Sequence, residues 1–186
     1  MMKSRPSLLL AASILGILAG AAKGEEVPAA LSGGHDIGRK DHGRPCVLIA
    51  AALGVETDVF REAFRGVTPA KGRGPTGGEA RRNKTALLRL LGPHGVTNER
   101  LDEVSDYYRF RPQDGELWKH RDAKVHAVVK DGKLVEVVVD DPGAGYTTPP
   151  KVKVRGFEKA EFVVELSFGE ELKTNGSIRS IKLKAR

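Results

Sequence analysis

Residues 125–154 read VHAVVKDGKLVEVVVDDPGAGYTTPPKVKV, and no other stretch of the 186-residue chain carries so dense a structural signal. Asp131-Gly132 separates two runs rich in β-branched residues, which predicts a hairpin. A two-residue turn would place Lys130 opposite Lys133, an unfavourable pair of like charges. The sequence therefore favours a three-residue loop that pairs Val129 with Lys133. That register puts five apolar side chains on one face: Val125, Ala127, Val135, Val137 and Val139.

A corner follows the hairpin. Gly143 and Gly145 can adopt positive φ angles, and Pro149-Pro150 predict an extended approach to an edge strand over residues 151–155. Tyr146 has two interpretations, a ligand-stacking residue or a plug of the corner whose hydroxyl caps a backbone group. The plug is favoured because a buried tyrosine usually finds such a partner.

The pattern of residues 132–139 returns in residues 176–183, where Leu134 matches Ile178 and Val137 matches Ile181. The preceding strand also returns, because the alternating apolar positions of residues 123–129 match those of residues 160–166. The C-terminal half is therefore predicted to contain one and a half copies of a β unit.

Residues 143–152 resemble the G-x-G-Y-x-x-P-P-x-V β repeat of phage virion proteins and of bacterial surface and secreted proteins. The resemblance covers about residues 123–184 and implies a structural or adhesive β module without catalytic residues. Residues 92–109 resemble small secreted bacterial proteins of uncharacterised function. In those proteins a similar helical half precedes a β half.

The N-terminal segment, residues 1–24, is predicted to be a secretory signal, because Lys3 and Arg5 precede an apolar run with small residues at 19–22. The run is short for a membrane-spanning helix, which needs about 20 residues; retention as an uncleaved anchor is the alternative. No later segment is expected to span a membrane. Residues 25–44 are polar and glycine-rich and are predicted to form a flexible linker.

The chain is basic, with a formal charge of +7. Outside the cytoplasm such a surface is expected to meet anionic glycans, cell-wall polymers or lipid head groups rather than nucleic acid. The alternative is that the charge only keeps the protein soluble. Cys46 is the single cysteine, so an internal disulfide is excluded.

Four helices are predicted within residues 45–110, at 45–53, 57–65, 78–91 and from Thr97 or Asn98 to 109. Gly66 is expected to end the second helix in a left-handed conformation. Residues 111–122 are predicted to be a linker in which Trp118 seals the helices against the sheet, with surface ligand stacking as the alternative. Residues 123–186 supply the strands. The predicted fold is α+β, a small N-terminal helical subdomain followed by a mostly antiparallel sheet of about five strands.

The glycine-rich loop before the third helix is the weak candidate for an anion site. Gly72, Gly74 and Gly77 fit G-x-G-x-x-G by letter, but a helix precedes them where a dinucleotide site needs a strand. The following helix carries three cations, and helix N-termini favour anions. The candidate ligand-binding residues are Arg81, Arg82 and Lys84 here, with Tyr146 and Trp118 as the two stacking candidates. The favoured alternative is that the loop is only a mobile connection.

Two other groups of residues have chemistry-bearing types. His94 with Asp102, Glu103, Asp106 and Tyr107 could support acid–base chemistry, but acidic residues on an exposed helix face are usually solvated. No catalytic residue is assigned. His35, Asp36, Asp41, His42 and Cys46 are metal-ligand types whose spacing fits no zinc pattern. No metal and no cofactor is predicted.

The sequence thus predicts a non-enzymatic extracytoplasmic protein that binds or scaffolds cell-envelope material. Its expected partner is an anionic envelope polymer or another extracytoplasmic protein. A small secreted hydrolase or transferase that uses the helical half, and a subunit of a larger secreted complex, are the alternatives.

Overall fold

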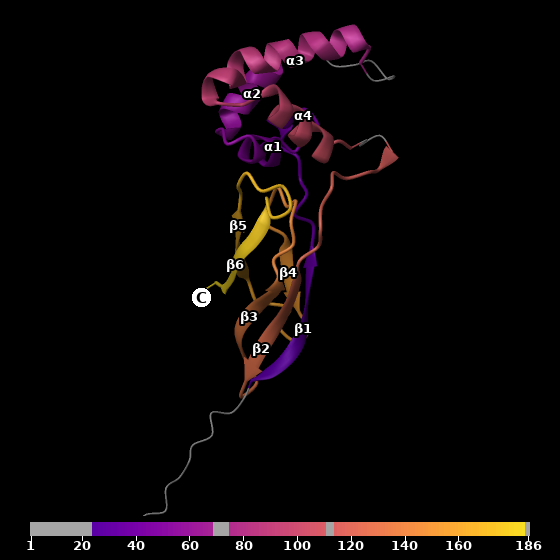
Figure 1. The fold of residues 1–186 in the computed structure, drawn as a ribbon. Helices are drawn as coiled ribbons and strands as arrows, with labels where there is room; N and C mark the ends of the chain where they lie inside the picture. The colour runs from indigo at the N-terminus through magenta and orange to yellow at the C-terminus, as the bar shows by residue number, and fades with distance from the viewer. Residues whose placement is uncertain (1–23, 69–74, 111–113, 185–186) are drawn as a thin grey trace, which may run out of the picture.

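The computed structural model describes residues 24–68, 75–110 and 114–184, so all of the predicted signal except Gly24 lies outside the described residues. Within them the fold is α+β, with the helices gathered at one end of the molecule and the strands extending away from it (Figure 1). The elements in chain order are β1 (Glu25–Ser32), the 3-10 turn η1 (Arg39–Asp41), α1 (Cys46–Ala52), α2 (Thr57–Arg65), α3 (Gly77–Leu91), the 3-10 turn η2 (Gly92–His94), α4 (Asn98–Tyr107), β2 (Lys124–Lys130), β3 (Lys133–Asp141), β4 (Lys151–Val154), β5 (Phe162–Ser167) and β6 (Ser177–Leu183).

The four α-helices of the described chain follow the predicted pattern closely. At the start of α4 the Thr97 side chain accepts a hydrogen bond from the Arg100 amide at 3.2 Å, as a helix cap should. Leu101, Val104 and Tyr108, the predicted core face of this helix, are all buried. Gly66 differs from the prediction, because its φ of −77° continues the right-handed conformation at the end of α2. No helix of the described residues is both long enough and apolar enough to cross a bilayer.

The strands form two antiparallel sheets in place of the single sheet of about five strands that we expected. The larger has the order β3-β2-β1-β4, and the smaller consists of β5 and β6. As predicted, β4 follows Pro149-Pro150 and lies at an edge.

The segment 25–44 was wrongly predicted to be a flexible linker, and the helical part is therefore not N-terminal in the fold. Residues 25–32 form β1, which lies inside the larger sheet between β2 and β4. Val27 pairs with Ala127 of β2, and Leu31 pairs with Val152 of β4. Exposed and partly buried residues alternate along β1, so its apolar side chains point to the β core.

The β2–β3 turn also differs from the predicted register. Asp131 and Gly132 have φ angles of 49° and 69°, and Lys130 pairs with Lys133 across a two-residue turn. Asp-Gly favours this type I′ geometry, because its twist matches that of the flanking strands. Both lysines are exposed to solvent, which weakens their repulsion, and the turn geometry prevails.

A β-bulge after this turn decides which side chains reach the core. Leu134 pairs with Val129, whereas Glu136 pairs with Val128, so Val135 is the extra residue. Val135 is 52% exposed and was wrongly predicted to lie on the apolar face. Leu134 packs against the β core in its place.

The two hairpins, β2–β3 and β5–β6, share this bulge at matching positions. In the second hairpin Leu166 pairs with Ile178 and Glu165 with Ser180, so the extra residue is Arg179. Ile178 is the position that matches Leu134 in the sequence echo. The hairpins differ in their turns, because a nine-residue loop (168–176) replaces the two-residue turn of the first.

Two clusters of buried apolar side chains form the interior, one among the helices and one among the strands. Asn175, from the loop of the second hairpin, is 1% exposed and crosses between them. Its Nδ2 donates to the Leu48 carbonyl of α1 at 2.8 Å and to the Tyr108 hydroxyl at 2.9 Å, and its Oδ1 accepts from the Gly169 amide at 3.2 Å. This side chain therefore ties the second hairpin to the helices.

Candidate functional site

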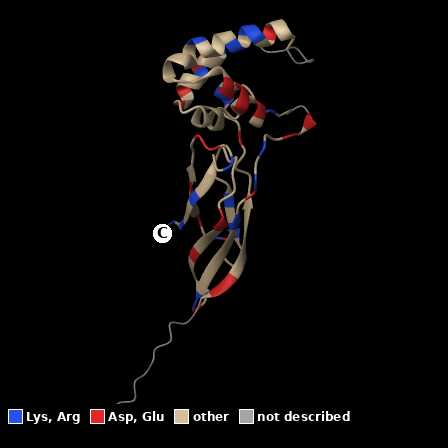
Figure 2. Cartoon of the chain, in the orientation of Figure 1, with Lys and Arg blue, Asp and Glu red and all other residues tan. Residues whose placement is uncertain are grey.

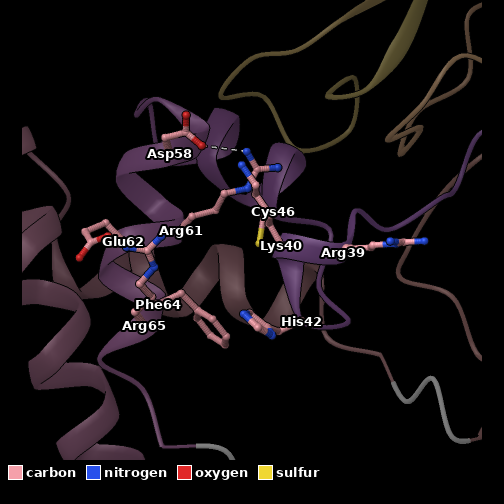
Figure 3. Close-up of a pocket in the computed structure, with 9 residues that line it drawn as sticks. All are labelled: Arg39, Lys40, His42, Cys46, Asp58, Arg61, Glu62, Phe64 and Arg65. Atoms are coloured by element: carbon pink, nitrogen blue, oxygen red, sulfur yellow. Dashed lines mark hydrogen bonds and ion pairs between the residues drawn. The ribbon is translucent and has the colours of Figure 1, made fainter.

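A cavity between η1 and α2 gathers four arginine and lysine side chains (Figure 3). Its volume is about 530 Å³, and it is lined by Arg39, Lys40, His42, Cys46, Asp58, Arg61, Glu62, Phe64 and Arg65. Because four of these nine residues are Arg or Lys, we call this cavity the basic pocket.

Asp41 fixes the two walls of the basic pocket against each other. Its buried carboxylate accepts a hydrogen bond from Arg61 Nε at 2.6 Å, and Arg61 Nη1 reaches Asp58 at 2.9 Å. The bond to Asp41, followed by the bond to Asp58, raises the pKa of Arg61, so the guanidinium keeps its charge. Since Asp41 ends η1 and Arg61 lies on α2, this ion pair sets the shape of the pocket.

Arg39 and Lys40 supply the uncommitted charge. Both side chains are exposed, and neither takes part in an ion pair within the described residues. Arg65 pairs with Glu62, but their side chains are 73% and 59% exposed. Exposed pairs contribute only about 0–1 kcal/mol, so an incoming anion can replace Glu62 at little cost. Arg39, Lys40 and Arg65 are therefore the cations of the lining that an anionic group can engage, although Figure 3 shows Arg39 extending away from Arg65. Arginine binds such groups with a planar fork of donors.

Cys46 lies at the inner side of the basic pocket, and its thiol is expected to be unreactive. The residue is 1% exposed, and its Sγ lies 3.8 Å from the Asp41 carbonyl oxygen. Burial, with a smaller contribution from Asp41, raises the pKa of the Cys46 thiol to about 12. The thiolate is the nucleophilic and metal-binding form, so Cys46 acts as the small core residue that the sequence predicts.

The cations predicted near the glycine-rich loop do not gather at one site within the described residues, because Lys84 lines a cavity of about 250 Å³ that Arg81 and Arg82 do not line. Arg81 and Arg82 are exposed on α3, while Lys84 Nζ is committed to Asp102 at 2.7 Å. Thr76 and Glu79 form a capping box that already satisfies the start of α3 and places a carboxylate there. That carboxylate disfavours an anion at this helix end. Gly72 and Gly74 lie outside the described residues.

Figure 2 shows basic and acidic residues interspersed over the helices, with several basic segments along α3. The intermixing explains why the candidate acid–base neighbourhood does not assemble. Asp102 pairs with Lys84, Glu103 with Arg100, and Asp106 with Arg109. His94 is exposed on η2. The three carboxylates therefore serve separate ion pairs rather than one catalytic pair.

Tyr146 and Trp118 are 2% and 0% exposed. The Tyr146 hydroxyl accepts a hydrogen bond from the Ala123 amide at 2.9 Å, which is the predicted corner plug. Trp118 Nε1 donates to the Gly145 carbonyl at 2.8 Å while its ring packs in the helical cluster, which is the predicted seal. Neither ring offers the exposed face that ligand stacking needs.

The glycines of the corner adopt the predicted conformation. Gly143 and Gly145 have φ angles of 64° and 86°. A Cβ at Gly145 would lie 2.7 Å from the Cβ of His120, so the position lacks space for a side chain as well. The corner is thereby pressed against the segment that precedes β2.

A histidine pair beside the corner was missed by sequence reasoning. His35 stacks on Tyr146 at a ring-centroid distance of 5.0 Å, and the His120 ring lies 4.8 Å away. Both histidines line a cavity of about 290 Å³ with Asp122. Buried His35 Nε2 has no hydrogen-bond partner within the described chain, and burial followed by the charge of His120 lowers the pKa of His35. No local signal joins residues so far apart in the sequence.

The five metal-ligand types of residues 35–46 are dispersed by the fold. His35 lies at the corner, and Asp36 Oδ2 accepts a hydrogen bond from the Thr148 hydroxyl at 3.0 Å. Asp41 holds Arg61, while His42 and Cys46 line the basic pocket. In residues 24–68, 75–110 and 114–184, no three His, Cys, Asp or Glu side chains come together to hold a metal ion.

No protein-family model, no curated protein and no solved structure matches this chain.

Proposed function

We propose that this chain is a non-enzymatic extracytoplasmic protein that binds an anionic polymer of the cell envelope through the basic pocket. The observation that carries the proposal is the pairing pattern inside the pocket. Arg61 is neutralised and held by Asp41 and Asp58, whereas Arg39 and Lys40 enter no ion pair within the described residues. The charge of Arg61 is therefore balanced within the protein, whereas Arg39 and Lys40 remain available to a ligand.

The chemistry of the pocket favours carboxylate, phosphate or sulfate groups presented on a polymer. Arginine binds planar oxyanions through two parallel hydrogen bonds, and lysine adds a point charge. The exposed pair of Arg65 with Glu62 lets a third cation join when an anion arrives. The partly buried Phe64 ring adds an apolar contact of the kind that a sugar or acyl group can use.

The extracytoplasmic part of the proposal is supported by the sequence. Lys3 and Arg5 precede an apolar run and a small-residue segment, which is the pattern of a secretory signal. Without Lys3 and Arg5 of the signal, the 29 basic and 24 acidic residues that remain give a formal charge of about +5, which suits a surface that meets anionic envelope material.

Retention on isolated envelope material tests the proposal. The naturally processed chain is mixed with envelope fractions of its source, and with dextran sulfate as a defined polyanion, from about 0.1 M to about 1 M salt, over which the Debye length falls from about 10 Å to about 3 Å. We expect retention that fades with salt and is lost in Arg39→Glu/Lys40→Glu.

The matched control is Arg81→Glu/Arg82→Glu, which changes the net charge equally at two exposed cations of α3. This variant should remain bound. Equal loss in both variants would show a general charge effect and refute the pocket. No retention of the parent chain on either material would refute the function. Retention of the protein in the cytoplasm would refute the localisation.

A further inference from the structure

The open edge of β5 carries an inference that is independent of the basic pocket. In the first hairpin the outer side of β2 is covered by β1, which runs antiparallel with Val27 opposite Ala127. In the second hairpin no strand of the described residues pairs with the outer side of β5. Val164 is the β5 position that matches Ala127. The edge of β2 that corresponds to the open edge of β5 is therefore covered by an added antiparallel strand, β1.

Of the usual protection of an edge strand, β5 has only one charged side chain, Glu165. Edge strands are commonly blocked by lysine, proline or a bulge. The β4 edge has Lys151 and Lys153, and β3 contains its bulge and lies against β6. By contrast β5 reads FVVELS, and Figure 1 shows it at the border of the strand region. Three of the six exposed large apolar side chains of the described chain lie on or beside this hairpin: Val163, Phe168 and Leu183.

We propose that β5 pairs antiparallel with β5 of a second copy of this chain and forms a two-fold symmetric dimer. The backbone restricts the register. The Lys184 amide donates to the Glu161 carbonyl at 2.8 Å, and hydrogen-bonded pairs alternate along an antiparallel ladder. The amides of Phe162 and Val164 therefore point to the open edge. Two Val164 residues can exchange both backbone hydrogen bonds across a two-fold axis.

The side chains select the same register. Centring the pair on Val163 would place Glu161 opposite Glu165 of the second copy, and centring it on Glu165 would oppose two identical carboxylates. Centring it on Val164 places Glu165 opposite Val163 and Phe162 opposite Leu166. A two-fold interface must be self-complementary, and this register satisfies that requirement.

The dimer is expected to be weak and reversible. Stable interfaces bury about 1,200–2,000 Å², and a six-residue strand pair covers less than that. Association should therefore depend on protein concentration and should be visible only at the upper end of a titration.

Sedimentation velocity over a wide concentration range tests the proposal on the naturally processed chain. Val163→Glu puts like charges opposite each other twice per dimer and should weaken association about two- to thirtyfold. Val163→Lys puts opposite charges at the same place and should preserve or strengthen it. The matched control is Val135→Glu, because Val135 is 52% exposed against 47% for Val163 but lies on β3. Circular dichroism verifies that each variant is folded.

A cross-link provides an independent measurement. In the proposed register Val163 and Glu165 of the two copies form a non-hydrogen-bonded pair, whose Cα separation of about 4.5 Å suits a disulfide. Val163→Cys/Glu165→Cys should give a covalent dimer on mild oxidation, and buried Cys46 should not interfere. A parent chain that stays monomeric at every concentration, a dimer that both Val163 variants change alike, or a double variant that forms no cross-link would overturn the proposal.

Discussion

Replacing Asn175 with alanine should loosen the helices from the second hairpin. The side chain is 1% exposed and makes three hydrogen bonds: two to the helical part, at Leu48 and Tyr108, and one to Gly169 in its own loop. Alanine keeps the backbone but removes all three bonds. The Gly169 amide can turn to water because that glycine is exposed, whereas Leu48 and Tyr108 are 0% and 3% exposed. Two buried groups are therefore left without this partner.

The expected loss follows from those two groups. A buried polar group that loses its partner costs about 1–3 kcal/mol, and the Leu48 carbonyl belongs to a helix and can keep a backbone bond. We therefore expect Asn175→Ala to lower the free energy of unfolding by about 2–4 kcal/mol. That is a large share of the stability of a typical domain, about 5–15 kcal/mol. Tyr108→Phe removes only the hydroxyl acceptor and should cost about 1 kcal/mol.

Urea unfolding measures both changes, with Trp118 fluorescence as one probe and far-ultraviolet circular dichroism as the other. Trp118 is the sole tryptophan and is fully buried where the helical cluster meets the corner. The two probes should coincide in the parent chain and separate in Asn175→Ala if the helices detach first. Asn83→Ala is the matched control, since Asn83 also makes two hydrogen bonds to backbone atoms, both exposed. A loss below about 0.5 kcal/mol for Asn175→Ala, or one equal to the control, would refute the reasoning.

Three further predictions concern single residues. Gly145→Ala should destabilise by about 2–4 kcal/mol in urea unfolding and Gly156→Ala by only about 1 kcal/mol, because both have similar positive φ angles but only Gly145 lacks space for a Cβ; equal losses would contradict this. Burial, and then the charge of His120, lowers the pKa of His35 below 6.5, so the unfolded chain takes up this proton first as the pH falls. The contribution of His35 to the free energy of unfolding should therefore decrease below about pH 6.5, against the opposite contribution of His126, whose pKa the hydrogen bond to Asp140 raises. His35→Phe should remove the decrease that His35 causes, and a pH dependence equal to that of the parent chain would exclude His35 as its source. Cys46, with a pKa raised to about 12, should react with a thiol reagent at mildly alkaline pH far more slowly in the folded than in the urea-unfolded chain, and equal rates would show that the thiol is accessible.

Local patterns in the sequence predicted the elements whose signals are local. The spacing of Leu101, Val104 and Tyr108 predicted the buried face of α4, and Thr97 was one of the two predicted caps, whereas the helix ends at Tyr107 rather than at 109. The echo between residues 132–139 and 176–183 placed equivalent strands in two hairpins. In both cases the pattern that predicts the element lies within a short segment of the sequence.

Elements that depend on distant partners were missed. Residues 25–32 become a strand only because β2, about a hundred residues later, pairs with them, and Pro28 and two glutamates disguise the alternation. The register of the first hairpin was predicted from the repulsion of Lys130 and Lys133. Turn geometry proved stronger than a repulsion between solvated charges.

The candidate site was the least predictable part of the molecule. Arg39 and Lys40 stand in a segment that reads as a linker, and Arg61 and Arg65 read as the exposed side of a helix. Their meeting depends on Asp41, whose burial and ion pair with Arg61 give no local signal. The same holds for His35 and His120, which the corner brings together.

The unequal turns of the two hairpins have a consequence for how such a protein can grow. Both hairpins have the same interrupted ladder, yet only the nine-residue loop of the second reaches the helices through Asn175. In that hairpin the contact with the helices is thus made by a turn, and turns tolerate insertion more readily than strands. An added hairpin with a tight turn would lengthen the β part without disturbing this contact, whereas the hairpin with the long loop joins the strands to the helices.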